Sequence, residues 1–342
     1  MTRYLIGRLS VFIIAVFLLT VFSFSLNYLF PGDPITNMSG IRSFQSSYPL
    51  MVELRGGDQN LVIQYMRYLQ HLFAGDWGLS LSNGTPVFAD GIQHFMASME
   101  LILLALLVAV VFGLPLGVFA ASRFRQRSDQ TVISLAMVGY SIPVFWLAQL
   151  MILLFAIKLG WFPITGQINP LYGVEPQTGS ILIDVFLSDS EYKAAALQDA
   201  LNHIVLPVLI LAIMPMMLLL RLMRNATQEM LQKPFVKAAR ARGLSEFRVL
   251  VKHAIPNAVQ SVLQQTTLIF SLLLTNSIVV ESIFNWPGMG NWLIRSIFER
   301  DYPIIQAAVL MFAFVILFFN LLVELYHGWR FPIVRHEQYA TR

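Results

Sequence analysis

Six long apolar stretches dominate the chain, and polar segments separate them. A run of about 20 apolar residues can cross the ~30 Å hydrocarbon layer of a bilayer as a helix. The pattern therefore predicts an all-α polytopic membrane protein with six transmembrane helices, at about 9–29, 101–121, 131–157, 204–220, 262–280 and 304–323. We expect a single transmembrane domain over 1–342, with polar loops at 30–99 and 158–203 and a charged loop at 233–256.

Two local patterns refine these elements. The third run is interrupted by Ser141-Ile142-Pro143, where a proline removes a backbone donor and kinks a helix. Pro143 is thus a candidate pathway residue, although a simple packing kink explains it equally well. Within the first polar loop, residues 59–73 have helical periodicity, which predicts a helix lying along the membrane surface.

Composition agrees with a membrane protein. Of the 342 residues, 56% are apolar and 12% are charged, a balance that soluble domains of this length do not show. The chain has no cysteine, which excludes a disulfide framework and thiol chemistry.

The distribution of basic residues predicts the orientation. With the N-terminus inside, the inner segments hold 16 Lys and Arg residues and the outer segments hold 7. Because basic residues concentrate on the cytoplasmic side, both termini and the charged loop are expected in the cytoplasm. The chain is therefore predicted to cross a membrane several times.

The loop at 233–256 is the longest strongly charged segment, with six basic residues and one acid. Pro234 suits a first helical turn, Gly243 suits a left-handed helix end, Ser245 suits an N-cap, and Pro256 is expected to limit the second helix. The loop therefore predicts two short helices joined at a glycine. A solvated basic loop and a nucleic-acid-binding helix pair are the alternatives, and we expect no nucleic acid because basic membrane loops are the rule on this side.

The loop resembles the EAA loop of ABC importer permeases, the helical elbow that docks in a cleft of the ATPase subunit. Lys237-Ala238-Ala239, Gly243 and Pro256 have its spacing, with Lys237 in place of the usual Glu, His253 for an Ile and Ile255 for a Leu. Permeases of the dipeptide and oligopeptide branch commonly lack that Glu. They also have stretches similar to Pro31 to Pro34, Gly75 to Ser80, and Phe284 to Gly290 here.

The resemblance covers nearly the whole chain and implies the type I ABC importer permease fold, with a location in the bacterial inner membrane. Within the branch, the chain looks like Sap-type permeases, linked to antimicrobial-peptide resistance, at three loop stretches: 171–176, 187–190 and 336–342. The implied partners are a second homologous permease, two ABC ATPase subunits, a periplasmic substrate-binding protein and membrane lipid. The implied docking residues are Lys237, Ala238, Ala239, Arg240, Arg242, Gly243, Leu244 and Pro256.

No catalytic or metal site is predicted, so the chain is not expected to be an enzyme. The sequence lacks a G-x-x-x-x-G-K-[ST] phosphate loop, and its six histidines lack metal-ligand spacing. No cofactor is expected on this chain, and ATP and Mg are expected on the partner ATPases. The candidate pathway or gate residues are Pro143, Asn276, Glu281, Trp286, Pro287, Gly288 and Gly290.

Among these residues, Glu281 stands out because a carboxylate beside an apolar run is costly unless it is paired or hydrated. An interfacial carboxylate that reaches water is the alternative. Trp286 to Gly290 suits a rigid interfacial turn.

The expected function is ATP-driven, alternating-access transport of peptides, with cationic antimicrobial peptides as one candidate class. Each outer loop carries five acids, which would concentrate cations, although depletion of Lys and Arg outside also follows from topology. Transport of a polyamine such as putrescine, export by the same kind of complex, and a self-contained secondary transporter are the alternatives. A membrane-anchored module that holds anionic lipid or nucleic acid is a further rival.

Overall fold

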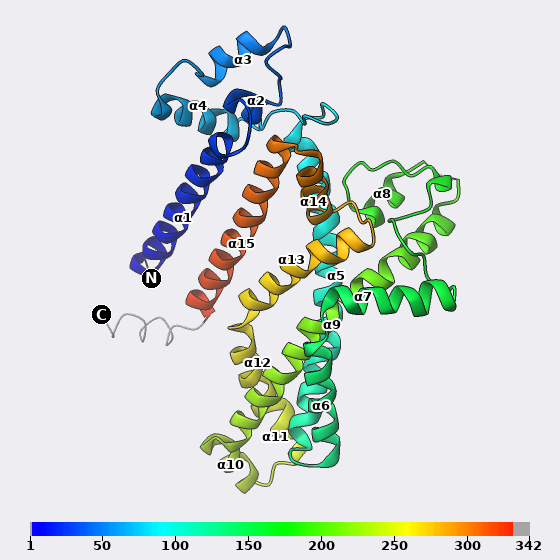
Figure 1. Cartoon of the computed structure of the whole chain (residues 1–342). Helices are drawn as coiled ribbons and strands as arrows, with labels where there is room; N and C mark the ends of the chain where they lie inside the picture. The colour runs from blue at the N-terminus through cyan, green and yellow to red at the C-terminus, as the bar shows by residue number, and fades with distance from the viewer. Residues whose placement is uncertain (1, 190, 331–342) are drawn as a thin grey trace. The chain divides into compact units, whose positions relative to one another are not determined.

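The computed structural model describes residues 2–189 and 191–330, and no strand occurs among them (Figure 1). The long helices are α1 (Thr2–Leu29), α5 (Val87–Ser122), α9 (Lys193–Gln232), α13 (Thr266–Ile283) and α15 (Tyr302–Arg330). The shorter ones are α2 (Pro34–Ser39), α3 (Tyr48–Arg55), α4 (Leu61–Phe73), α6 (Arg127–Ser141), α7 (Val144–Met151), α8 (Ile181–Leu187), α10 (Pro234–Ala241), α11 (Glu246–Val249), α12 (Ile255–Leu263) and α14 (Met289–Glu299). The Sap-like ending at 336–342 lies outside the described residues, as does Ser190.

Five of these helices are long and apolar enough to cross a membrane, namely α1, α5, α9, α13 and α15. A sixth span is present if α6 and the segment from Val144 to Lys158 count as one broken span. The all-helical polytopic fold is thus confirmed. Helix α9, with 40 residues, runs well past its predicted apolar core at 204–220, whereas α13 begins four residues later than the predicted span at 262–280.

The third predicted span differs from a gently kinked helix. Its two arms meet at an angle of 98°. Ile142 is extended, with φ −76° and ψ 124°, because the residue before a proline is pushed out of the helical region. Pro143 is the N-cap of α7, which begins at Val144, and after α7 the chain continues as a π-helical turn from Ile152 to Lys158. The proline therefore turns the chain sharply at this point.

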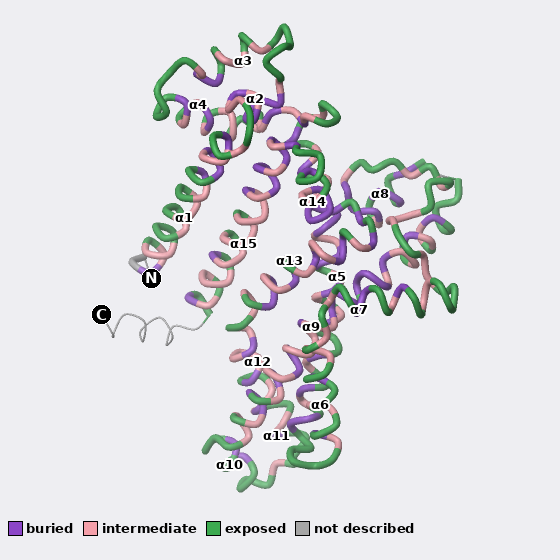
Figure 2. Tube along the Cα trace, in the orientation of Figure 1, coloured by how far each residue is buried: buried purple, intermediate pink, exposed green. Residues whose placement is uncertain are grey.

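The residues group into two compact units. The described part of the first comprises 2–97, 176–180 and 287–330, and that of the second comprises 98–175 and 181–286 without residue 190. Helix α5 begins in the first unit and ends in the second. Figure 2 shows buried positions on the helix faces that pack together, whereas the outer faces of the long helices are exposed.

In the first unit, α1 and α15 pack side by side in opposite directions. The Tyr4 hydroxyl donates to the carbonyl of Glu324 at 2.9 Å, and the Gln306 amide donates to the carbonyl of Ser23 at 2.7 Å. Phe12 lies between these contacts against Phe314, with ring centroids 6.2 Å apart. These contacts join the two helices along most of their length.

In the second unit, small residues let α5 approach α9. A Cβ added at Gly113 would lie 2.8 Å from the Met216 carbonyl oxygen, and one at Gly117 would lie 2.6 Å from that of Leu220. Small residues four apart allow such close backbone approach between membrane helices. Helix α9 also packs against α6, α12 and α13, so it organises this unit.

The second polar loop contains an unforeseen helix, α8. The Glu100 carboxylate on α5 accepts hydrogen bonds from the backbone amides of Ile181 and Leu182, each at 3.0 Å. These amides belong to the first turn of α8, where backbone donors lack partners within the helix. A side chain 81 residues away in sequence therefore caps the helix.

Candidate functional site

The charged loop folds as the two helices that its sequence predicts. Helix α10 begins at Pro234, and Gly243 follows it with a left-handed φ of +81°. A Cβ at Gly243 would meet no atom within 4 Å, so backbone conformation rather than space requires glycine here. We call residues 233–256 the elbow.

A small apolar core holds the elbow together. Val236 and Ala239 from α10 pack on Val249 from α11, with Leu231 and Leu244 at the edge. Ala239 and Leu244 were predicted for docking, yet Ala239 is buried and Leu244 is half-buried. Their side chains therefore shape the elbow from inside.

An ion pair also joins the two helices. The Arg240 guanidinium donates to the two carboxylate oxygens of Glu246, at 2.8 and 3.0 Å. This hydrogen bonding holds the pKa of the Glu246 carboxyl below its usual value. Both side chains are exposed, so the pair orients the helices more than it stabilises the fold.

The exposed face of the elbow combines basic, small and aromatic side chains. Lys237, Ala238 and Arg242 are exposed there, as predicted for a docking surface. Phe247 is also 76% exposed, and Phe235 is exposed on α10. We did not single out these aromatics from the sequence, although two phenylalanines within a basic loop were a readable signal. Large exposed apolar side chains in a folded loop favour a protein-binding surface.

The end of the elbow differs from its prediction. Ser245 occupies the N-cap position of α11, but its side chain makes no capping hydrogen bond. Pro256 does not end the second helix: it lies in the first turn of α12, which runs on to Leu263. A π-helical turn from Leu250 to Ala254 precedes it, and such a turn accommodates the missing proline donor. The elbow is thus continuous with α12, which packs along α9.

A second set of contacts, missed from the sequence, fixes α9 near the elbow's origin. Asp129 on α6 is 2% exposed and accepts two hydrogen bonds from Arg224 on α9, both at 2.8 Å. The backbone amide of Arg125 also donates to Asp129, at 2.9 Å. The two charges are 95 residues apart in sequence, so no local sequence pattern predicts that they form a pair.

The candidate pathway residues divide between the two units. Pro143, Asn276, Glu281 and Trp286 belong to the second unit, whereas Pro287, Gly288 and Gly290 belong to the first. Gly288 is the N-cap of α14, and Trp286 is fully buried. Pro143 lines an open groove of about 620 Å³ with Met137 and Trp146.

Glu281 is fully buried, so the alternative of an interfacial carboxylate reaching water is wrong. Its Oε1 accepts a hydrogen bond from the Ser98 hydroxyl at 2.6 Å. On the same helix, the Asn276 amide lies 3.3 Å from the Met214 sulfur. The second unit therefore places two polar side chains of α13 against α5 and α9.

No group of three or more potential metal ligands occurs among the residues that the structure describes. Among the described histidines, His71, His94 and His203 instead contact neighbouring groups through Nδ1. His203, for example, contacts the Asp199 carbonyl through Nδ1 at 2.8 Å.

Comparison with known families places this architecture in a class. The model for "Binding-protein-dependent transport system inner membrane component" matches residues 113–336, and a companion model for the N-terminal part of such components matches 1–114. The chain belongs to this family of inner-membrane transport components, whose members are permease subunits of ABC transporters. It is a multi-pass protein of the inner membrane.

Individual relatives match over their full length. The chain is 37% identical to the di/tripeptide transport system permease protein DppB of Pseudomonas aeruginosa (strain UCBPP-PA14) over 339 residues, which are 99% of this chain and 100% of the relative. It is 33% identical to the dipeptide transport system permease protein DppB of Escherichia coli K12, with 99% and 100% covered. The putrescine export system permease protein SapB of the same strain is 34% identical, with both chains fully covered.

Proposed function

We propose that this chain is a permease subunit that moves peptides across the inner membrane. Two kinds of observation support the proposal: full-length similarity to di/tripeptide and dipeptide permeases, and the resemblance of the Gly75 to Ser80 and Phe284 to Gly290 stretches to that branch. Putrescine is the second candidate substrate, because one relative of comparable identity carries that name.

The elbow is the proposed docking element for a separate ATPase subunit. The observation that carries this role is the exposure of Lys237, Ala238, Arg242 and Phe247 on an elbow whose two helices are joined by the Arg240 and Glu246 pair. An alanine between long basic side chains leaves room for a partner's groove, and Phe247 supplies apolar area to bury. ATP and Mg would bind the partner, since this sequence lacks a phosphate loop.

Movement would pass from the elbow to the other helices of the second unit through a continuous path. The elbow runs without a loop into α12, α12 packs along α9, and α9 packs along α13. A rigid shift of docked elbows on nucleotide binding would therefore displace α9 and α13 together. This is the alternating-access movement expected of the transporter.

The proposed assembly has four further components: a second homologous permease, two ATPases and a substrate-binding protein at the outer face. Candidate substrate contacts on this chain remain Asn276 and Glu281, both on α13. A self-contained secondary transporter is the rival account, since it would work without an ATPase.

The test uses Gly243→Val, with Gly173→Val as its matched control. Both glycines have positive φ, +81° and +62°, and a Cβ at either would meet no atom within 4 Å. Complexes would be purified from native membranes, reconstituted, and assayed for ATP hydrolysis and for uptake of dipeptide and of putrescine. We expect Gly243→Val to abolish coupled uptake and Gly173→Val to retain it.

Two results would contradict the proposal. Normal coupled uptake by Gly243→Val would remove the elbow from the mechanism. A chain that purifies without an ATPase and still transports would establish the secondary transporter instead.

A further inference from the structure

Helix α4 has two apolar faces, and only one of them packs against the protein. Tyr65, Tyr68 and Leu72 face a core that includes Phe24 and Met38. On another side, Val62, Met66 and Phe73 are 65%, 54% and 82% exposed. At 3.6 residues per turn these three side chains lie within about 40° of one another. We call Val62, Met66 and Phe73 the outer stripe.

The attachment of α4 to α1 fixes the depth of this stripe. Tyr65 shares a 2.8 Å hydrogen bond with Thr20, and Tyr68 donates to Ser23 at 3.0 Å. The Tyr28 hydroxyl also donates to the side chain of Gln64, near the end of α1. Helix α4 therefore contacts α1 between Thr20 and Tyr28.

This stretch of α1 lies within the apolar span. The run from Leu9 to Leu29 has 21 residues, or about 31 Å of helix, which matches the ~30 Å hydrocarbon thickness. Thr20 and Tyr28 lie nine residues and one residue before Leu29, so the contacts fall about 14 to 2 Å inside that end. Helix α4 thus lies alongside the outer half of the apolar span, within reach of acyl chains.

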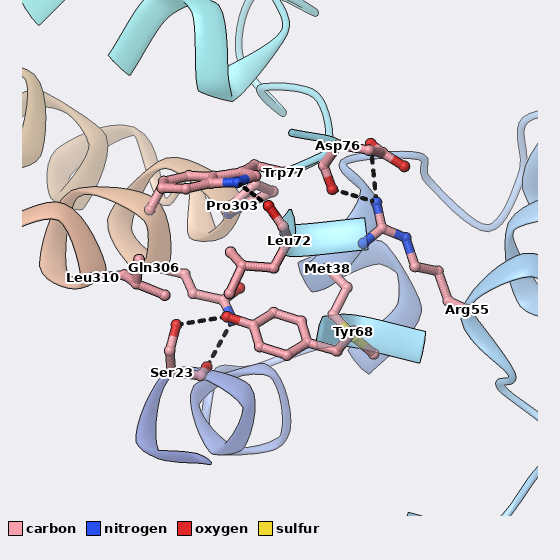
Figure 3. A pocket seen from close by; sticks show the side chains of 11 residues that line it. Ser23, Met38, Arg55, Tyr68, Leu72, Asp76, Trp77, Pro303, Gln306 and Leu310 are labelled. Atoms are coloured by element: carbon pink, nitrogen blue, oxygen red, sulfur yellow. Dashed lines mark hydrogen bonds and ion pairs between the residues drawn. The ribbon is translucent and has the colours of Figure 1, made fainter. Parts of the chain in front are cut away.

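Helix α4 cannot easily turn its stripe inward, because a polar cluster locks its other face (Figure 3). The Trp77 indole donates to the Leu72 carbonyl at 3.0 Å, and Arg55, only 3% exposed, pairs with Asp76 at 3.2 Å. The cavity that these residues share with Ser23 and Gln306 has about 20 Å³, room for one water. The exposure of the stripe is thus built into the fold.

The basic side chain of α4 points away from the outer stripe. Arg67 is the one Lys or Arg residue of α4, and its guanidinium donates to the Leu54 carbonyl at 3.0 Å. The same part of α1 that contacts α4 also has apolar, exposed side chains at Leu18, Val21 and Phe22, as a spanning helix has where it faces lipid. The outer stripe has the same apolar, exposed character.

We propose that the outer stripe inserts into the outer leaflet of the bilayer and anchors the subdomain of α2, α3 and α4 to the membrane surface. The occupant is lipid acyl chain. An amphipathic helix with an uncharged apolar face buries that face at the headgroup boundary. The anchor would hold the first polar loop at a fixed height above the membrane.

The chain has no cysteine, so single cysteines can be introduced directly. Val62→Cys, Met66→Cys and Phe73→Cys would each carry a nitroxide label in the full chain, reconstituted into nanodiscs with its co-purifying subunits. Collision rates with oxygen, which concentrates in lipid, and with a water-soluble nickel chelate report the surroundings. Val21→Cys on α1 is the lipid control, and exposed Gln59→Cys is the water control.

We expect the three stripe labels to prefer oxygen, as at Val21, and Gln59 to prefer nickel. Nickel preference at the stripe would place it in water and overturn the proposal. Labels shielded from both agents would show that a protein subunit covers the stripe, which overturns it as well. Quenching of a fluorophore at the same cysteines by brominated lipids gives an independent reading, with loss of signal expected at the stripe and at Val21 but not at Gln59.

Discussion

Asp129 and Arg224 join α6 to α9 through two hydrogen bonds of 2.8 Å, and the Asp129 side chain is 2% exposed. The pair attaches the turn between α5 and α6 to α9, the helix that ends where the elbow begins. Arg224 also stacks over Phe124, with its guanidinium carbon 5.0 Å from the ring centroid. The pair therefore fixes the part of α9 that would receive a movement of the elbow.

Removing the charge of Asp129 should destabilise the second unit. Asp129→Asn leaves the partly buried Arg224, whose side chain is 19% exposed, without its counter-charge, at a cost of up to about 3 kcal/mol. Glu229→Gln is the matched control on the same helix, because Glu229 pairs with Lys233 on the exposed surface and contributes about 0.5 kcal/mol or less. Thermal unfolding in detergent measures both, and equal midpoints for the two variants would refute the prediction.

The contact of α5 with α9 predicts a steric effect at Gly117. A Cβ there would lie 2.6 Å from the Leu220 carbonyl and 2.8 Å from the Met223 Cβ, neither of which can move freely. Gly117→Ala should cost about 1–3 kcal/mol. Gly139→Ala should cost less, because its added Cβ would meet the flexible Met217 side chain at 3.1 Å. Thermal shifts in the reverse order would contradict this packing.

The elbow should loosen in acid. Because the folded pKa of Glu246 is lowered, its stabilising contribution is present above the ordinary glutamate pKa of about 4.3 and is lost as pH falls through the folded value. Hydrogen exchange of amides in 234–249, corrected for intrinsic rates, measures this. We expect Glu246→Gln to exchange faster than the parent chain at pH 7 and at the same rate well below pH 4. A difference that persists in acid would exclude the ion pair as the cause.

The cap on α8 should depend on Glu100. Glu100→Ala removes the acceptor for the Ile181 and Leu182 amides, and loss of such a cap costs about 1–2 kcal/mol. Faster amide exchange confined to 181–187 is the expected result. Glu175→Ala, an exposed acid of the same loop, should leave exchange unchanged. Unaltered exchange in the Glu100 variant would show that packing alone holds α8.

The sequence predicts those features of the fold that depend on residues close to one another in the chain. Apolar runs identified the spans, and Pro234 with Gly243 identified the two elbow helices, because helix starts and ends follow from local chemistry. The angle of the bend at Pro143 could not be predicted from the sequence, because proline permits a range of angles and packing selects one of them. Pro256 was misread because a π-helical turn, invisible in composition, accommodates it.

Contacts between residues far apart in the chain could not be predicted from the sequence. Asp129 with Arg224 and Glu100 with α8 join positions that no local pattern connects. Ala239 was predicted on the docking face because alanine leaves a bare helix surface whichever way it points. Only the position of Val249 shows that Ala239 faces inward. The docking and pathway roles themselves remain predictions.

The elbow's contact with an ATPase is the central claim, and cross-linking tests it most directly. Single cysteines at Ala238 and Phe247 on the elbow would carry a short cross-linker in the purified, ATP-hydrolysing complex. A cysteine at Leu171 in the second polar loop, a position even more exposed than Phe247, is the control. We predict covalent attachment of the ATPase chain at Ala238 and Phe247 and none at Leu171. An active complex in which neither elbow position captures the ATPase would contradict the account.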